Sequence, residues 1–74
     1  GEGYSDISIQ TPDRTGIVIE LKYAEDGNLE KACSEALRQI EEKKYAEGLK
    51  RRGTKKIIKY GIAFYEKECM VVMA

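Results

Sequence analysis

One stretch of helical periodicity, placed between two pairs of extended segments, constrains the fold of this chain more than any other feature. Its apolar residues recur at three- and four-residue spacing: Leu29, Ala32, Cys33, Ala36, Leu37 and Ile40. This spacing predicts a helix with an apolar stripe suited to packing on a sheet. Asn28 stands where a helix N-cap is expected, Glu30 lies in the first turn, and Gly53 is placed to end the helix.

The segments on either side of this helix have the patterns of β-strands. Residues 4–10 alternate, and residues 17–22 follow a turn cluster, "TPDRTG", so the two segments predict a β-hairpin. Residues 55–64 and 69–74 are also apolar and extended, and the polar turn "YEKE" separates them. We therefore expect the order strand, strand, helix, strand, strand.

This order predicts an α/β fold with a mixed sheet. A helix between the second and third strands favours a right-handed crossover, which makes those two strands parallel. A single helix covers only one face of a sheet, and an uncovered face of apolar residues normally needs a partner. We expect more chain, or a second copy, to pack there.

The second strand carries charged residues within its apolar pattern. Ile17, Ile19 and Leu21 alternate with a set that shares the other face: Val18, Glu20 and Lys22. With the turn centred near residues 13 and 14, paired residues have numbers that sum to about 27, which places Asp6 opposite residues 20–22. Asp6, Glu20 and Lys22 would then meet at one end of the hairpin, within reach of a shared ion. The alternative is that Glu20 and Lys22 form an exposed ion pair on a solvated strand face.

Length and composition exclude several classes of protein. A chain of 74 residues with 42% hydrophobic and 35% charged residues has room for a single compact domain and is not of disordered type. The sequence contains no histidine, which removes serine-triad, cysteine–histidine and histidine-ligated metal chemistry. Cys33 and Cys69 are too few for a disulfide framework, so we interpret both as buried, reduced thiols and expect a cytoplasmic protein without a membrane segment.

The charges balance, with 13 basic and 13 acidic residues, but they are unevenly distributed. Basic residues crowd the middle of the chain: Lys43, Lys44, Lys50, Arg51, Arg52, Lys55, Lys56 and Lys59. Acidic residues are more frequent in the first third of the chain. The pattern fits either a basic rim beside an acidic site or a solvated helix face and turn.

Two carboxylates and a lysine on one strand face are suited to metal-dependent phosphate chemistry. Mg²⁺ and Mn²⁺ prefer oxygen ligands, stabilise charge on a phosphate and lower the pKa of an attacking water. A nearby lysine can orient that water or stabilise the transition state.

The stretches "SDISI", "IVIELK", "ALRQIEEKKYAEGL" and "IIKYGIAF", in this order, closely resemble the PD-(D/E)XK nuclease superfamily. In particular they resemble the nuclease-like domain at the C-terminal end of bacterial proteins that carry an AAA-ATPase-like region. The resemblance implies a restriction-endonuclease-like core. That core usually begins with a helix and a further strand, which residues 1–74 lack, so we expect a single, partial domain.

The resemblance also implies roles for individual residues. Asp6 and Glu20 would bind one Mg²⁺ or Mn²⁺ with help from the Leu21 carbonyl, and Lys22 would assist the attacking water. Gln39 and Tyr45 would support the site by orienting water or contacting the phosphate backbone. The alternative for Gln39 is a purely structural role, in which its amide at the edge of the helix forms a hydrogen bond to the sheet. The alternative for Tyr45 is that of an amphipathic residue at the rim, and a kink near residues 43–45 would change its position.

The implied function is a metal-dependent nuclease that acts on DNA, with RNA the less favoured substrate. Two other classes stay open: a catalytically silent nuclease-fold module that binds nucleic acid or regulates an attached ATPase, and an association domain that dimerises through the open sheet face. The expected partners are nucleic acid and either a second copy or an upstream ATPase-like domain.

Overall fold

The computed structural model describes residues 4–43 and 45–74, with the side chains of residues 4, 5, 45 and 46 outside that description. The elements follow in the order β1 (Tyr4–Gln10), β2 (Thr15–Tyr23), α1 (Leu29–Glu42), α2 (Tyr45–Arg51), β3 (Lys56–Tyr65) and β4 (Glu68–Met73). No helix in this described part of the chain is long and apolar enough to cross a membrane.

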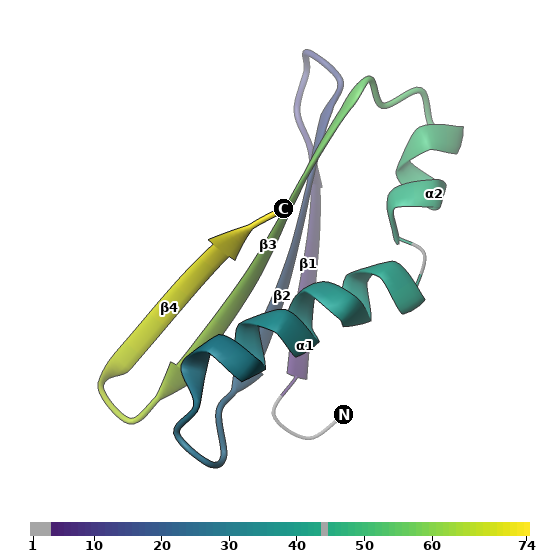
Figure 1. Ribbon diagram of the computed structural model, residues 1–74. Helices are drawn as coiled ribbons and strands as arrows, with labels where there is room; N and C mark the ends of the chain where they lie inside the picture. The colour runs from purple at the N-terminus through teal and green to yellow at the C-terminus, as the bar shows by residue number, and fades with distance from the viewer. Residues whose placement is uncertain (1–3, 44) are drawn as a thin grey trace.

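The strands form one mixed sheet in the spatial order β1-β2-β3-β4. β1 and β2 pair antiparallel, β2 and β3 parallel, and β3 and β4 antiparallel. Figure 1 shows the crossover from β2 to β3, in which α1 and α2 lie on one side of the sheet. The predicted α/β fold and the parallel pairing of the second and third strands are confirmed.

The predicted start of the helix is confirmed. The Asn28 side chain accepts a hydrogen bond from the Lys31 backbone N–H at 3.1 Å, which satisfies one of the free donors at the start of α1. Gly53 adopts a φ of 84° and donates its N–H to the Lys50 carbonyl at 3.0 Å, so it ends the helical region as expected.

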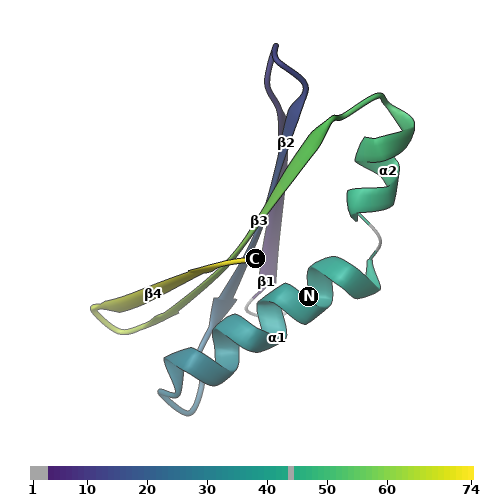
Figure 2. The same cartoon turned by 45° about the horizontal axis from the view of Figure 1, so that its top comes forward.

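The prediction of one continuous helix up to Gly53 is wrong. α1 ends at Glu42, Lys43 is its C-cap, and α2 begins at Tyr45, so the break lies near residues 43–45, where the sequence left a kink open as an alternative. Figures 1 and 2 show α2 turned away from the direction of α1. The bend brings Leu49 of α2 onto the sheet, where it is buried in one cluster with Val18 and Ile40. Burial of this leucine favours the bent arrangement over a straight helix.

Small residues allow α1 to lie close to the sheet. Gly61 of β3 faces the helix, and a Cβ atom added there would lie 2.6 Å from the Cys33 carbonyl oxygen and 3.4 Å from the Ala36 Cβ. Ala36 itself is fully buried. The close approach seals the sheet face that carries the charged residues of β2.

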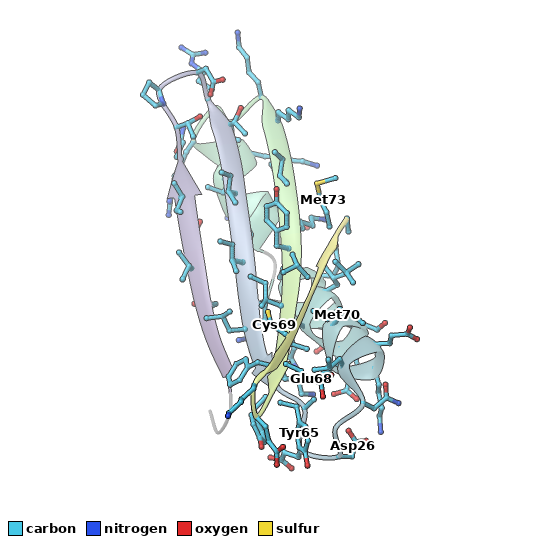
Figure 3. The ribbon with its side chains drawn as sticks, turned by 90° about the vertical axis from the view of Figure 1, so that its left-hand side faces the viewer. Asp26, Tyr65, Glu68, Cys69, Met70 and Met73 are labelled. Carbon is cyan, nitrogen blue, oxygen red and sulfur yellow. The ribbon has the colours of Figure 1, made fainter. Side chains whose placement is uncertain are left out.

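The other face of the sheet carries no helix in the described residues, as expected from a single crossover. Large apolar side chains are exposed there, among them Ile7, Ile9, Val71 (55%) and Met73 (64%). Figure 3 looks onto this face, with Met73 and Cys69 on β4 and the helices behind the sheet. Cys69 is exposed, so the prediction that both cysteines are buried is correct only for Cys33.

Candidate functional site

The strand pairing brings two acidic residues opposite each other. Asp6 of β1 and Glu20 of β2 are direct partners in the antiparallel register. Opposed residues of an antiparallel pair point to the same face, with Cβ atoms about 4.5–5.5 Å apart. The prediction that Asp6 lies opposite residues 20–22 is confirmed.

Glu20 is fully buried, with 0% of its surface exposed, although most of its neighbours in the core are apolar. Its register partner on β3 is Gly61, over which the backbone of α1 closes the sheet. The Oε1 atom of Glu20 is buried and has no hydrogen-bond partner within the described residues. A buried acceptor without a partner is costly, so it calls for a ligand or another explanation.

Lys43 supplies the cation for this acidic pair. Its Nζ atom lies 3.3 Å from Oε2 of Glu20 and 3.4 Å from Oδ2 of Asp6. Asp6 and Lys43 are partly exposed, whereas Glu20 is sealed beneath them. The site is therefore reached from solvent past Asp6 and Lys43.

Lys22 points to the same sheet face but forms an ion pair with Glu35 of α1. Both side chains are shielded, with exposed fractions of 16% for Lys22 and 29% for Glu35. The alternative of an exposed Glu20–Lys22 ion pair is contradicted, because Glu20 is buried and each of the two residues pairs with a charged residue beyond β2.

Three polar residues of α1 or its C-cap stand in a row above the site. Glu35, Gln39 and Lys43 are four residues apart, which places them on one face of a helix. Because Glu35 contacts Lys22 and Lys43 contacts Glu20, the half-buried Gln39 lies between the two ion pairs. Sequence reasoning singled out Gln39 and did not assign Glu35 or Lys43 to the site; the four-residue spacing indicates that the three share a helix face, but not which charged residue each one meets.

The two remaining predicted site residues are Leu21 on β2 and Tyr45 on α2. Leu21 lies within β2 with register partners on both sides, Ser5 on β1 and Ile62 on β3, so its carbonyl lies in the plane of the sheet between neighbouring strands. Tyr45 begins α2, directly after the bend, but its side chain lies outside the described part of the structure.

The acidic pair fits a hard divalent cation. Asp6 and Glu20 offer carboxylate oxygens from one sheet face, and Mg²⁺ is commonly held by one or two carboxylates with water and substrate phosphate completing its shell. No cluster of three or more acidic, cysteine or histidine side chains suited to a metal occurs among the residues that the structure describes. The described residues thus offer a pair of carboxylates on this face rather than a larger cluster.

The Cys33 thiol is buried in a core cluster with Ala24, Ala32 and Ala63. Burial raises the pKa of the Cys33 thiol, and its Sγ donates a hydrogen bond to the Met70 carbonyl at 3.3 Å. Nucleophilic cysteines react as thiolates in electropositive, partly exposed surroundings. Cys33 is a packing residue, as predicted.

Comparison with known protein families agrees with this fold. The sequence model of the PD-(D/E)XK nuclease superfamily matches residues 1–74. The chain belongs to the PD-(D/E)XK nuclease superfamily. Neither the search of curated proteins nor the search of solved structures gave a match.

Membership confirms the resemblance to the superfamily and the mixed-sheet, restriction-endonuclease-like fold. Superfamily members generally use divalent metal ions and interact with nucleic acid. The narrower resemblance to an ATPase-associated bacterial branch is not shown by this match.

Proposed function

We propose that this chain is a metal-dependent phosphodiesterase domain that hydrolyses DNA, with RNA the less favoured substrate. The observation that carries the proposal is the opposition of Asp6 and Glu20 on the helix-covered face, with a buried Glu20 oxygen that no described residue satisfies. A nuclease-superfamily fold makes a phosphodiester the natural substrate for such a site.

In this proposal Asp6 and Glu20 hold a Mg²⁺ or Mn²⁺ ion, with the Leu21 carbonyl as a third protein ligand. When bound, the ion would stabilise charge on the phosphate and lower the pKa of a water molecule. Lys22 faces the same side of the sheet as Glu20, and its ammonium, held by Glu35, is suited to orient that water. Gln39 is suited to the same task from α1, and Tyr45 to a contact with the phosphate backbone.

The site's surroundings support a nucleic-acid substrate. Five basic residues at the end of α2 and the start of β3 are exposed: Lys50, Arg51, Arg52, Lys55 and Lys56. They lie near the turn between β1 and β2, because the Lys55 N–H donates to the Arg14 carbonyl and Lys56 is in register with Thr15. At about 3.3 Å per residue, Glu20 is roughly 16 Å along β2 from this basic rim. Lys44, counted with these residues in the sequence, lies outside the described residues.

The test is cleavage of supercoiled plasmid and of labelled DNA and RNA strands with Mg²⁺ or Mn²⁺, for the wild type and Glu20→Gln. Glu25→Gln is the matched control, because Glu25 is exposed beyond the end of β2. We expect metal-dependent cleavage that Glu20→Gln abolishes and Glu25→Gln retains. Cleavage that survives in Glu20→Gln would contradict the assigned site.

A catalytically silent module is the second candidate function, and the exposed basic rim favours it. Its signature is nucleic-acid binding that is equal in the wild type and Glu20→Gln, without cleavage. If three to five phosphates are contacted, log K should fall with log salt at a slope of about −3 to −4.5. In this case variants in which two of the five rim residues are replaced by glutamine should bind nucleic acid more weakly, and their log K should depend less steeply on log salt. The attached ATPase-like region and the bacterial origin stay predictions of the resemblance. The cytoplasmic location, predicted from the cysteines, and a homodimer, predicted from the uncovered sheet face, also stay predictions.

A further inference from the structure

The α1 C-cap places a lysine ammonium where the two carboxylates converge. The Nζ atom of Lys43 lies within 3.4 Å of one oxygen of Asp6 and one oxygen of Glu20 at the same time. Glu20 is fully buried, and an ionised carboxylate at such a depth needs a cation beside it. Lys43 neutralises the buried charge from a partly exposed position.

A divalent ion that is held through the same two oxygens, Oε2 of Glu20 and Oδ2 of Asp6, needs the space that the ammonium occupies. Carboxylate oxygens approach Mg²⁺ to about 2.0–2.1 Å, much closer than they approach the ammonium in this structure. Two cations that share the facing oxygens Oε2 of Glu20 and Oδ2 of Asp6 would also repel each other at short range. The ammonium and the divalent ion are therefore mutually exclusive at these two oxygens.

We propose that Lys43 is a built-in competitor of the metal: it holds Asp6 and Glu20 in the resting protein, and metal binding releases it. This inference rests on the proposed function for the identity of the metal ligands, but it assigns a new role to a residue outside the superfamily signature.

Lys43 also lies at the break between α1 and α2, so its release couples the metal site to that junction. Its backbone N–H donates to the Gln39 carbonyl as the C-cap of α1, and α2 begins two residues later. Displacing the Lys43 side chain removes its ion pairs with Asp6 and Glu20, which link this junction to the sheet. The freed ammonium lies next to the metal position, where the negative charge of a bound phosphate would attract it.

The competition predicts tighter metal binding when the ammonium is removed. The apparent Kd is the intrinsic Kd divided by the fraction of molecules in which the site is open. A lysine bound in about 90–99% of molecules leaves about 10–1% of the sites open and therefore weakens metal affinity by about 10- to 100-fold. We expect Lys43→Gln to lower the Kd for Mn²⁺ by about tenfold or more, measured by isothermal titration calorimetry. Lys43→Arg, which keeps the charge, should stay close to the wild type.

Lys59→Gln is the matched control, because Lys59 also pairs with a glutamate of α1, Glu41, but contacts neither Asp6 nor Glu20. Its Mn²⁺ affinity should be unchanged. Equal tightening in Lys43→Gln and Lys59→Gln would show a general charge effect and overturn the proposal.

A second measurement needs no variant. The side-chain ε-CH₂ resonances of Lys43 in the wild type should move on saturation with diamagnetic Mg²⁺, while those of Lys59 stay in place. If metal binds without moving the Lys43 resonances, the proposed competition between Lys43 and the metal is overturned, while the proposed metal site still stands. Failure of Mg²⁺ and Mn²⁺ to bind both the wild type and Lys43→Gln would overturn the metal site as well, and Glu20→Gln that binds metal normally would overturn the ligand assignment.

Discussion

Replacing Gly61 by alanine tests whether the close approach of α1 to the sheet creates the buried site. The added Cβ would lie 2.6 Å from the Cys33 carbonyl oxygen and 2.9 Å from the Leu37 Cγ. The first neighbour is helix backbone, which cannot rotate away as a side chain can. The helix as a whole must therefore shift, or the strand must bend.

The expected cost follows from two opposing effects. Overpacking of a core contact costs about 1–3 kcal/mol, while alanine in place of glycine within a strand recovers about 0.5–1 kcal/mol of backbone entropy. We expect Gly61→Ala to lower the free energy of unfolding by about 1–2 kcal/mol. For a domain of this size each kcal/mol shifts the Tm by about 4–8 °C.

Gly48→Ala is the matched control, since nothing lies within 4 Å of a Cβ added at Gly48 in α2. The same substitution should there stabilise the protein by about 0.5–1 kcal/mol through helix propensity. Urea and thermal unfolding followed by circular dichroism measure both variants. If Gly61→Ala were as stable as Gly48→Ala, the close contact between α1 and β3 would not be the constraint inferred here.

Four further predictions concern individual side chains. Glu35→Gln should destabilise the protein by about 0.5–1 kcal/mol through the loss of its ion pair with Lys22, and a double-mutant cycle with Lys22→Met should return that coupling energy; zero coupling would refute the pairing. Thiol reagents should modify Cys69 rapidly and Cys33 only on unfolding. Because the folded chain holds the Cys33 proton more tightly than the unfolded chain, stability should fall as the pH rises above the ordinary thiol value of 9.0, and Cys33→Ala should lose this part of the dependence. Arg14→Gly should raise the free energy of unfolding by up to about 1 kcal/mol, since Arg14 adopts a left-handed φ of 67°, and a lower Tm would contradict this.

Local patterns predicted the parts of the fold that depend on neighbouring residues. The Asn28 cap and the Gly53 terminus follow from backbone groups within a few residues, so the sequence is enough to place them. The hairpin register also follows from a short turn and a two-residue alternation, which is why Asp6 could be placed opposite residues 20–22, where the structure pairs it with Glu20.

The break after α1 could not be predicted as firmly. No proline or glycine occurs between Glu42 and Tyr45, and the bend is favoured by burial of Leu49 against Val18 and Ile40. That contact joins α2 to a strand about thirty residues earlier, and helical periodicity carries no information about it.

The sequence by itself determined the order of the four strands, the position of the helical region between them, the mixed sheet and the superfamily to which the chain belongs. It also placed Asp6 opposite the charged end of the second strand. Only the tertiary structure decided which sheet face α1 covers. By apolar content alone the face of Ile17 and Ile19 is the better core, yet α1 packs on the face of Val18 and Glu20. The small residues Gly61 and Ala36 allow the helix to pack closely against that face. The cation beside Glu20 was likewise decided in three dimensions, because long lysine side chains reach across elements and their spacing in the chain does not reveal which carboxylate they meet.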